Sequence, residues 1–395
     1  MSAIVKPRVQ SVDVLRGIIM IIMVLDHVRD YFHIHGVDGS PTDMGTTTPS
    51  LFFTRWITHF CAPVFIFLSG MSAWLAGQKK TKKQQSVFLI KRGLWLIIAE
   101  VCIMTLVLTF NPNYTTIFLL VFWSIGFSMV ILGCMLWLPV TAIAIIGAVI
   151  VLGHNVFDSL TITNDTFGGS LLNFFVTGKL KFIKLTDNHF IIVGYAPIPW
   201  TGIMLLGYAA GQLFTSAKFT AEQRKKILLT TGGLITALFI VLRLINHYGD
   251  PVPAAPQKTW VFSLMSFLNA NKYPPSLDYT CMTLGPAMIV LALMEQIQNR
   301  FTGFVTIYGR VPFFYFVVHF FFIHVLLVIV FFASGYGAKA IVDSDSPFYF
   351  RPAHFGYDLW VVYCIWAAVV LILYKPCKWF HNYKLTHKYW WLSYL

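Results

Sequence analysis

Long apolar runs separated by short polar segments extend along the whole chain. Ten of these runs approach the roughly 20 residues that a membrane-spanning helix needs, near residues 14–34, 52–77, 88–110, 115–137, 139–156, 190–214, 226–246, 279–298, 311–333 and 357–377. The segment 258–269, "KTWVFSLMSFLN", is too short to span and is expected to be interfacial or re-entrant. The pattern predicts an all-α, polytopic membrane protein with about ten (10–11) transmembrane helices, folded as one domain over residues 1–395.

The composition supports a membrane protein. Of the 395 residues, 57% are hydrophobic and 11% are charged, whereas soluble domains are roughly 45–50% apolar and about 25% charged. The cysteines lie within or beside the apolar runs, so we expect no disulfide framework. Walker A, GxSxG, GxGxxG and CxxC motifs do not occur in the sequence, and the soluble enzyme classes that they mark therefore gain no support.

The distribution of lysine and arginine predicts the orientation of the chain. With a cytoplasmic N-terminus, Lys6, Arg8 and the run "KKTKK" at 79–83 lie on the inner side, where basic residues accumulate. Ten spans then place the C-terminus inside as well. The first helix has no small-residue cleavage site after it and is predicted to be an uncleaved signal anchor. The net charge of +13 thus reflects membrane topology, and we expect no nucleic-acid partner.

Ionisable residues within the apolar runs are the main candidates for function. Such residues are costly at membrane depth and by default mark a functional cavity. They are Arg16, Asp26, His27, Arg29 and Asp30 in the first run, Arg55 and His59 in the second, Glu100, Arg243, and His319 and His324 in the ninth. Glu100 can equally be a structural partner of an arginine.

The first run places a cation and an imidazole on one face. Arg16 and His27 are eleven residues apart, about three helical turns or roughly 16 Å of rise. Asp26 and Asp30 lie within one turn of His27, and a carboxylate beside an imidazole can set its tautomer and raise its basicity. His27 is therefore a candidate general base. The alternative is that both carboxylates only neutralise Arg29 at the outer end of the helix.

Two further runs place histidines near this level. His59 and Arg55 lie in the outer half of the second run, at a depth similar to that of His27. His319 and His324 are five residues apart, about 140° around a helix, so they do not share a face and no shared metal site is expected. We expect His319 to face the cavity, with His324 as the alternative.

The sequence resembles a known family at several of these segments. "SVDVLRGIIMIIMVLDHVRDYF", "FFTRWITHFCAPVFIFLSG", "KYPPSLDYTCMTLGP", "YGRVPFFYFVVH" and the terminal "WWLSYL" resemble the bacterial membrane family related to the catalytic domain of heparan-α-glucosaminide N-acetyltransferase. The spacing of Arg16 and His27 is also similar to that in the broader membrane O-acyltransferases. The segment "DHVRD" differs from the lysosomal enzyme, so whether His27 accepts the acyl group or only a proton stays open.

The resemblance implies an acyltransferase of the bacterial inner membrane. Its donor would be cytoplasmic acetyl-CoA or another acyl-CoA, and its acceptor a sugar or other small molecule on the outer side. The expected catalytic residues are His27, Asp26, Asp30, Arg29, His59 and His319, with Arg16 and Arg310 meeting the donor phosphates. The expected substrate-binding residues are Arg55, Lys272, Tyr273, Asp278 and Tyr315.

Other functions and partners stay open at this point. A transporter or flippase would also use ionisable residues near the membrane centre, but it predicts symmetry-related broken helices that the sequence does not reveal. A haem or metal protein that uses His27, His59, His319 and His324 is a weaker alternative, and a structural or scaffold role is another. No metal is expected, the lipids of the membrane are expected partners, and a homodimer is left open.

Overall fold

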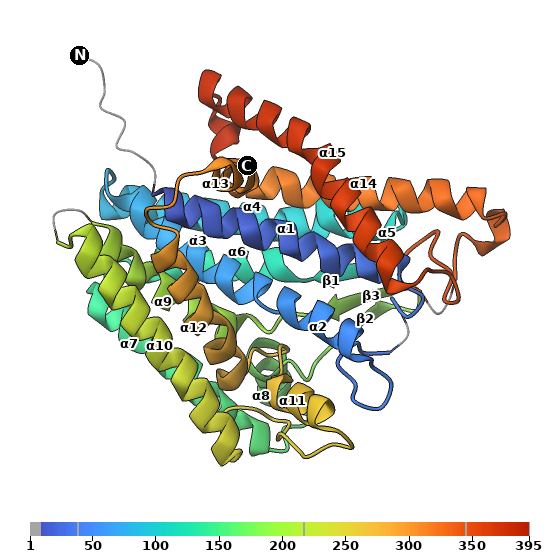
Figure 1. Cartoon of the computed structure of the whole chain (residues 1–395), viewed down its shortest axis with the longest axis horizontal. Helices are drawn as coiled ribbons and strands as arrows, with labels where there is room; N and C mark the ends of the chain where they lie inside the picture. Colours follow the sequence, from blue (N-terminus) through green and yellow to red (C-terminus); the bar gives the residue numbers. More distant parts are fainter. Residues whose placement is uncertain (1–8, 38, 216–217, 344–345, 395) are drawn as a thin grey trace.

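The computed structural model describes residues 9–37, 39–215, 218–343 and 346–394 as a mostly helical bundle (Figure 1). Lys6 and Arg8, which entered the topology prediction, lie outside the described residues. The first half of the chain forms α1 (Gln10–Phe32), α2 (Pro49–Thr58), α3 (Cys61–Gly77), α4 (Lys82–Ala99), η1 (Glu100–Met104), α5 (Thr105–Thr109), β1 (Thr116–Leu119), α6 (Val121–Met135), α7 (Val140–Gly153), η2 (His154–Ser159), α8 (Phe167–Leu172), η3 (Asn173–Thr177), β2 (Phe182–Thr186) and β3 (His189–Val193). The second half forms α9 (Pro197–Ala210), η4 (Gly211–Phe214), α10 (Ala221–Ile245), α11 (Trp260–Leu268), α12 (Leu277–Leu293), α13 (Arg300–Arg310), α14 (Pro312–Ala333), η5 (Ala338–Ala340), α15 (Leu359–Thr386) and η6 (Trp390–Ser393).

Five helical segments are long and apolar enough to cross a membrane. Within the described residues they are Pro49–Gly77, Val140–Ser159, Ala221–Ile245, Pro312–Ala333 and Leu359–Thr386. Val121–Met135, Phe167–Thr177 and Leu277–Leu293 are shorter apolar helices. Each of the ten runs expected to span contains a helix, but the number of spans and the orientation of the termini stay predictions. The short segment near 258–269 forms α11, a helix of 9 residues.

A small sheet corrects the all-α prediction. Its strand order is β1-β3-β2, with β1 parallel to β3 and β2 antiparallel to β3. The runs 115–137 and 190–214 were expected to be helical throughout, yet β1 and β3 occupy their starts and the helices α6 and α9 follow. Hydropathy alone does not distinguish a short apolar strand from the end of a helix. The paired strands therefore set where α6 and α9 begin.

Two of the apolar runs contain breaks in the regular helix. The second run divides into α2 and α3 at His59 and Phe60. The third run contains η1, a π-helical turn that begins at Glu100. The carboxylate of Glu100 accepts hydrogen bonds from the backbone N–H groups of Phe122 (2.6 Å) and Trp123 (3.1 Å). Glu100 thus binds the start of α6 rather than an arginine.

The helices α1 and α13 touch through their backbones. A Cβ built on Gly17 would overlap the carbonyl oxygen of Val305, and one built on Gly309 would overlap the carbonyl oxygen of Asp13. Glycine on both helices is therefore required at this crossing, as in other membrane helix pairs with small residues at the interface. The crossing also brings the α13 backbone beside Arg16, whose Nη1 donates to the carbonyl oxygen of Gly309 at 3.0 Å.

Replacing Gly17 with leucine is expected to destabilise the protein by about 1–3 kcal/mol or more, because α1 must move away from α13. The measurement is the thermal unfolding midpoint of the purified protein in detergent. Gly233→Leu on α10 is the matched control, since a Cβ at Gly233 meets nothing within 4 Å. Equal midpoints for the two variants would show that the helices are not in contact at Gly17.

Candidate active site

Helix α1 carries its ionisable residues through the middle of the bundle. It packs against α2, α3, α12, α13, α14 and α15, and Figure 1 shows it crossing the centre of the molecule. Asp13, Arg16, Asp26, Arg29 and Asp30 are its five charged residues. Each of them has at least one ion-pair partner, as the contacts below show. The side chains of α1 therefore face protein rather than lipid at both ends of the helix.

His27 and His319 form a hydrogen-bonded pair between α1 and α14. The Nδ1 atom of His27 lies 2.7 Å from Nε2 of His319. The other nitrogen of His319, Nδ1, lies 2.8 Å from the backbone carbonyl oxygen of Tyr315. A carbonyl oxygen can only accept, so Nδ1 of His319 carries the hydrogen and its Nε2 has a lone pair when the ring is neutral. His27 must then donate from Nδ1.

This hydrogen-bond chain leaves Nε2 of His27 as its basic nitrogen. A neutral imidazole that donates from Nδ1 keeps its lone pair on Nε2. If Nε2 accepts a proton, the imidazolium still donates from Nδ1 to His319. The ring of His27 is also held by Phe320 (centroids 4.1 Å apart) and by the edge of Phe316 (5.9 Å). The ring orientation that a general base requires is therefore built into the packing.

A cavity of about 60 Å³ lies beside the half-buried His27. Because a water molecule needs roughly 10–15 Å³ by this measure, the cavity can hold several waters or a small acyl group. Its walls come from α1, the end of α2, the start of α3, the start of α6, α14 and two loops, through Met23, Asp26, His27, Thr58, Cys61, Ala62, Phe65, Val121, Tyr195, Lys272 and Phe316. The cavity thus combines an imidazole, a carboxylate and an ammonium group with apolar walls.

The carboxylates near His27 are engaged by arginines. Asp26 Oδ1 accepts from Arg29 at 2.9 Å, and Asp26 Oδ2 accepts from Arg55 on α2. Asp30 Oδ1 accepts from Arg29 at 2.6 Å. The expectation that Asp26 or Asp30 sets the tautomer of His27 is therefore not matched by these contacts, because His319 occupies Nδ1. The structure matches the alternative, in which the carboxylates neutralise Arg29, and adds Arg55 as a second partner.

His59 lies at the break between α2 and α3 and is 4% exposed. Its backbone carbonyl oxygen accepts a hydrogen bond from the hydroxyl of Tyr279 at 2.6 Å, and the two rings meet edge to face. Within the described residues, its Nδ1 has no hydrogen-bond partner. His59 is therefore buried close to the Asp26–Arg55 pair, although it is not among the residues that line the cavity.

Lys272 reaches the cavity from the segment before α12. Its side chain lines the cavity with Asp26 and His27, and its Nζ lies 5.1 Å from the ring centre of Tyr273. Tyr273 is 40% exposed, and its ring meets that of Tyr195, another cavity residue, at 5.3 Å. The segment thus brings one buried cation and one partly exposed aromatic ring to this end of the site.

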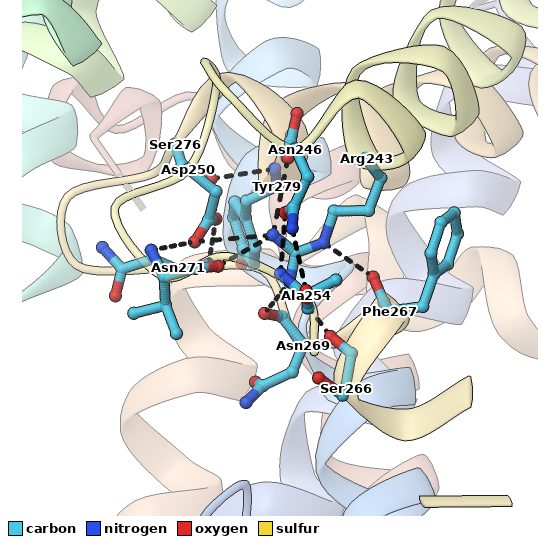
Figure 2. A network of polar contacts seen from close by, with 12 residues as sticks. Arg243, Asn246, Asp250, Ala254, Ser266, Phe267, Asn269, Asn271, Ser276 and Tyr279 are labelled. Carbon is cyan, nitrogen blue, oxygen red and sulfur yellow. Dashed lines mark hydrogen bonds and ion pairs between the residues drawn. The ribbon is translucent and has the colours of Figure 1, made fainter. Parts of the chain in front are cut away.

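A network around Arg243 holds this segment in place (Figure 2). The guanidinium of Arg243 donates to the backbone carbonyl oxygens of Phe267, Ser266, Asn269 and Val252 at 2.9–3.0 Å. It also forms ion pairs with Asp250 (3.9 Å) and Asp278 (3.7 Å). Arg243 is 2% exposed, so its guanidinium holds α11 and the loops beside it rather than lining a cavity.

Asp250 connects the same network to the backbone beside Lys272. Its Oδ2 accepts from the backbone N–H of Asn271 at 2.7 Å and from the hydroxyl of Ser276 at 2.6 Å. Burial raises the pKa of Asp250, and these hydrogen bonds oppose that shift in part. Ser276 also begins α12 by accepting from the N–H of Tyr279 at 3.0 Å. Hydrogen bonds to Asp250 therefore hold the chain both before and after Lys272.

Two of the residues expected to bind substrate lie in the packed interior. Asp278 is 2% exposed and belongs to the Arg243 network. Tyr315 is fully buried and contributes its backbone carbonyl oxygen to His319. Neither is among the residues that line the cavity, because each points into contacts between helices. Their positions favour structural and orienting roles.

His324, the alternative to His319, lies near the middle of α14, five residues after His319. Its Nε2 is 2.9 Å from the carbonyl oxygen of Tyr349 and its Nδ1 is 3.3 Å from that of Val107. Its ring stacks on Phe110 with centroids 3.7 Å apart. His324 thus joins α14 to α5 and to the loop that contains Tyr349, while His319 is the histidine that faces His27.

A second polar cluster lies at the N-terminal end of α1. Arg16 donates to Oδ1 of Asp13 at 3.1 Å and to the hydroxyl of Ser72 on α3 at 2.6 Å. Arg310, at the end of α13, lies 3.6 Å from Oδ2 of Asp13 and donates to Nε2 of His381 at 3.2 Å. The two arginines expected to meet the donor are thus brought together on one carboxylate, although they are distant in sequence.

Several residues of the site gave no signal in the sequence. Thr58, Cys61 and Tyr195 line the cavity, and Asp13 and Ser72 bind Arg16 at the N-terminal end of α1. Asp13 could have been found from its position one turn before Arg16, but the others require knowledge of helix packing. Within the part of the chain that the structure describes, no group of three His, Cys, Asp or Glu side chains is placed to hold a metal ion.

Comparison with known proteins identifies the family of the chain. No curated protein matches the chain. The family model described as heparan-alpha-glucosaminide N-acetyltransferase, catalytic, matches residues 8–242. The match covers more than half of the chain and includes Arg16, His27 and Arg55, whereas Lys272 and His319 lie beyond it. The chain therefore belongs to the heparan-alpha-glucosaminide N-acetyltransferase catalytic family.

Proposed function

We propose that the protein is a membrane acyltransferase that moves an acetyl or other acyl group from cytoplasmic acyl-CoA to a sugar or other acceptor on the outer side. Membership of the family supports a transmembrane acetyltransferase type of activity. The observation that carries the proposal is the His27–His319 pair, which leaves a basic nitrogen on His27 beside a cavity. We place the protein in the bacterial inner membrane with both termini in the cytoplasm.

In the proposed reaction, Nε2 of His27 removes a proton from the acceptor hydroxyl or amine as that group attacks the thioester carbonyl carbon. The new C–O or C–N bond forms, the C–S bond breaks, and the proton passes from His27 to the sulfur of CoA. This direct transfer needs no covalent enzyme intermediate. His319 keeps the imidazolium oriented because it accepts from Nδ1 throughout.

Lys272 is the proposed partner of the negative charge that develops on the thioester oxygen. Its ammonium lines the same cavity as His27 and is 9% exposed. Arg29 and Arg55 already bind Asp26, so we assign them to positioning this carboxylate. A fixed cation in a site with little water stabilises an oxyanion more than the same cation does in solution.

The proposed donor enters from the end of α1 where Arg16 lies. Arg16 and Arg310 share Asp13, so two guanidinium groups face a single carboxylate and favour an anion nearby. The rise between Arg16 and His27 is roughly 16 Å, which separates the phosphates of CoA from the thioester at its other end. A bound donor would then extend along α1.

Replacing His319 with phenylalanine is expected to lower kcat by roughly 5- to 150-fold, because His27 loses a hydrogen bond worth about 1–3 kcal/mol. The KM for acetyl-CoA should change little. His319→Gln should recover much of the rate, since its side-chain oxygen can accept from Nδ1 of His27. Release of the CoA thiol in steady state gives both constants. If the phenylalanine and glutamine variants have the same kcat, His319 does not orient His27.

Replacing Arg16 with glutamine is expected to raise the KM for acetyl-CoA by roughly 10-fold or more, since a charged hydrogen bond contributes about 1.5–3 kcal/mol. S-acetyl-N-acetylcysteamine, a donor without phosphates, is the matched control. Its KM should be the same for both proteins, because Arg16 has no phosphate to bind in that case. An equal rise for both donors would assign Arg16 to the packing of α1 alone.

A further inference from the structure

A groove of about 340 Å³ lies at the end of α3, away from His27. Its volume is within the roughly 300–1,000 Å³ of small-molecule sites. It is bounded by the end of α3, the start of α4, the turn between α6 and α7, and α9, which pack against one another. None of the catalytic or donor-binding residues proposed above lines it.

Two aromatic side chains and the amide of Gln85 line the groove. Trp74 and Tyr208 meet edge to face with ring centres 5.3 Å apart. Trp74 is held by a hydrogen bond from its Nε1 to Thr215 (3.2 Å), and Gln85 by one from its Nε2 to the carbonyl oxygen of Ala73 (3.0 Å). These bonds fix the side chains without a ligand, so the groove is preformed.

The groove is also lined by apolar residues and by one lysine. Leu138 is 40% exposed, and Pro139 and Val140 continue the same wall. The exposed Lys82, from the run "KKTKK", also lines the groove. The three segments that form the groove, 61–99, 121–153 and 197–220, contain no Asp or Glu. These segments therefore supply no carboxylate that could neutralise Lys82.

We propose that this groove binds the headgroup of an anionic phospholipid from the inner leaflet. Its phosphate would meet Lys82, and its glycerol and upper acyl chains would lie against the wall formed by Leu138 and Val140. Basic pockets between helices on the cytoplasmic side of a membrane are typical sites for anionic headgroups. The predicted orientation places the groove at that side, and its position is independent of the proposed chemistry at His27.

Native mass spectrometry with added phosphatidylglycerol or phosphatidylcholine tests this proposal. The wild-type protein should retain phosphatidylglycerol preferentially, and Lys82→Gln should bind it about fivefold more weakly, as expected for one cation near a membrane surface. Val140→Trp, which fills the groove without changing its charge, should also lose the lipid. Lys226→Gln, an exposed lysine of α10, is the matched control and should behave like the wild type.

Three results would overturn the proposal. Equal retention of the two lipids would show that the groove does not recognise an anion. Undiminished binding of phosphatidylglycerol by both groove variants would place the lipid elsewhere. Displacement of the lipid by adenosine 3′,5′-bisphosphate would assign the groove to the nucleotide end of acyl-CoA. None of these results bears on the role of His27, which is measured separately by acyl transfer.

Discussion

Replacing His27 with alanine is expected to lower the turnover of acetyl-CoA by roughly 10²–10⁴-fold, the usual contribution of a general base. The expected effect is on kcat, because the proposed donor phosphates bind at Arg16, about three turns away. Asp26 and Lys272 would remain in the cavity, but neither has the free imidazole nitrogen that the hydrogen-bond chain provides in the wild type. Release of CoA by purified protein in proteoliposomes gives the rate.

His247→Ala is the matched control, because His247 is an exposed histidine in the loop after α10. It should leave kcat and KM unchanged. The thermal midpoint of His27→Ala should stay near that of the wild type, so that a lost rate is not a lost fold. Turnover by His27→Ala equal to that of the wild type would remove His27 from the mechanism, whatever the family of the protein.

Replacing Arg243 with methionine is expected to destabilise the protein by about 3–5 kcal/mol, the largest stability effect that we predict. The change removes the donor for four backbone carbonyl oxygens. It also leaves Asp250 and Asp278 as buried carboxylates without their cation. The thermal midpoint in detergent measures the loss.

The physical cause can be separated by adding Asp250→Asn and Asp278→Asn to the Arg243→Met variant. These changes remove the unpaired charge, so the midpoint should recover in part, while the lost carbonyl hydrogen bonds prevent full recovery. Arg300→Met, at the exposed start of α13, is the matched control for loss of one arginine. A midpoint of Arg243→Met that equals this control would contradict the structural role of the network in Figure 2.

The sequence predicted contacts within one helix better than contacts between helices. Spacing along α1 correctly placed Asp26 and Asp30 within reach of Arg29. It did not reveal that Arg55, 29 positions later, also binds Asp26. Once both carboxylates bind arginines, His27 needs another partner, and His319 lies 292 positions away. The orienting group was therefore assigned to the nearest carboxylate, which is the error that local spacing produces.

The helices of the fold were also predicted better than the contacts between segments that are distant in sequence. Hydropathy located a helix in each of the ten apolar runs. It missed the sheet, because β1 pairs with β3, which lies far along the chain, and the hairpin of β2 and β3 is too short to give a clear pattern. It also missed the π-helical turn at Glu100, whose carboxylate binds the start of another helix, α6. Burial of a side chain between two elements leaves no periodic pattern in either element alone.

Proteoliposomes with acetyl-CoA on one side and glucosamine on the other test the proposed acyl transfer across the membrane. The wild-type protein should consume acetyl-CoA on the side of Arg16, CoA should stay on this side, and N-acetylated product should appear on the other. Hydrolysis of acetyl-CoA without formation of N-acetylated product would support acetyl-CoA as the donor and show that glucosamine is not the acceptor. If no acyl-CoA of any chain length binds or is consumed while glucosamine crosses the bilayer, the protein is a transporter and not an acyltransferase.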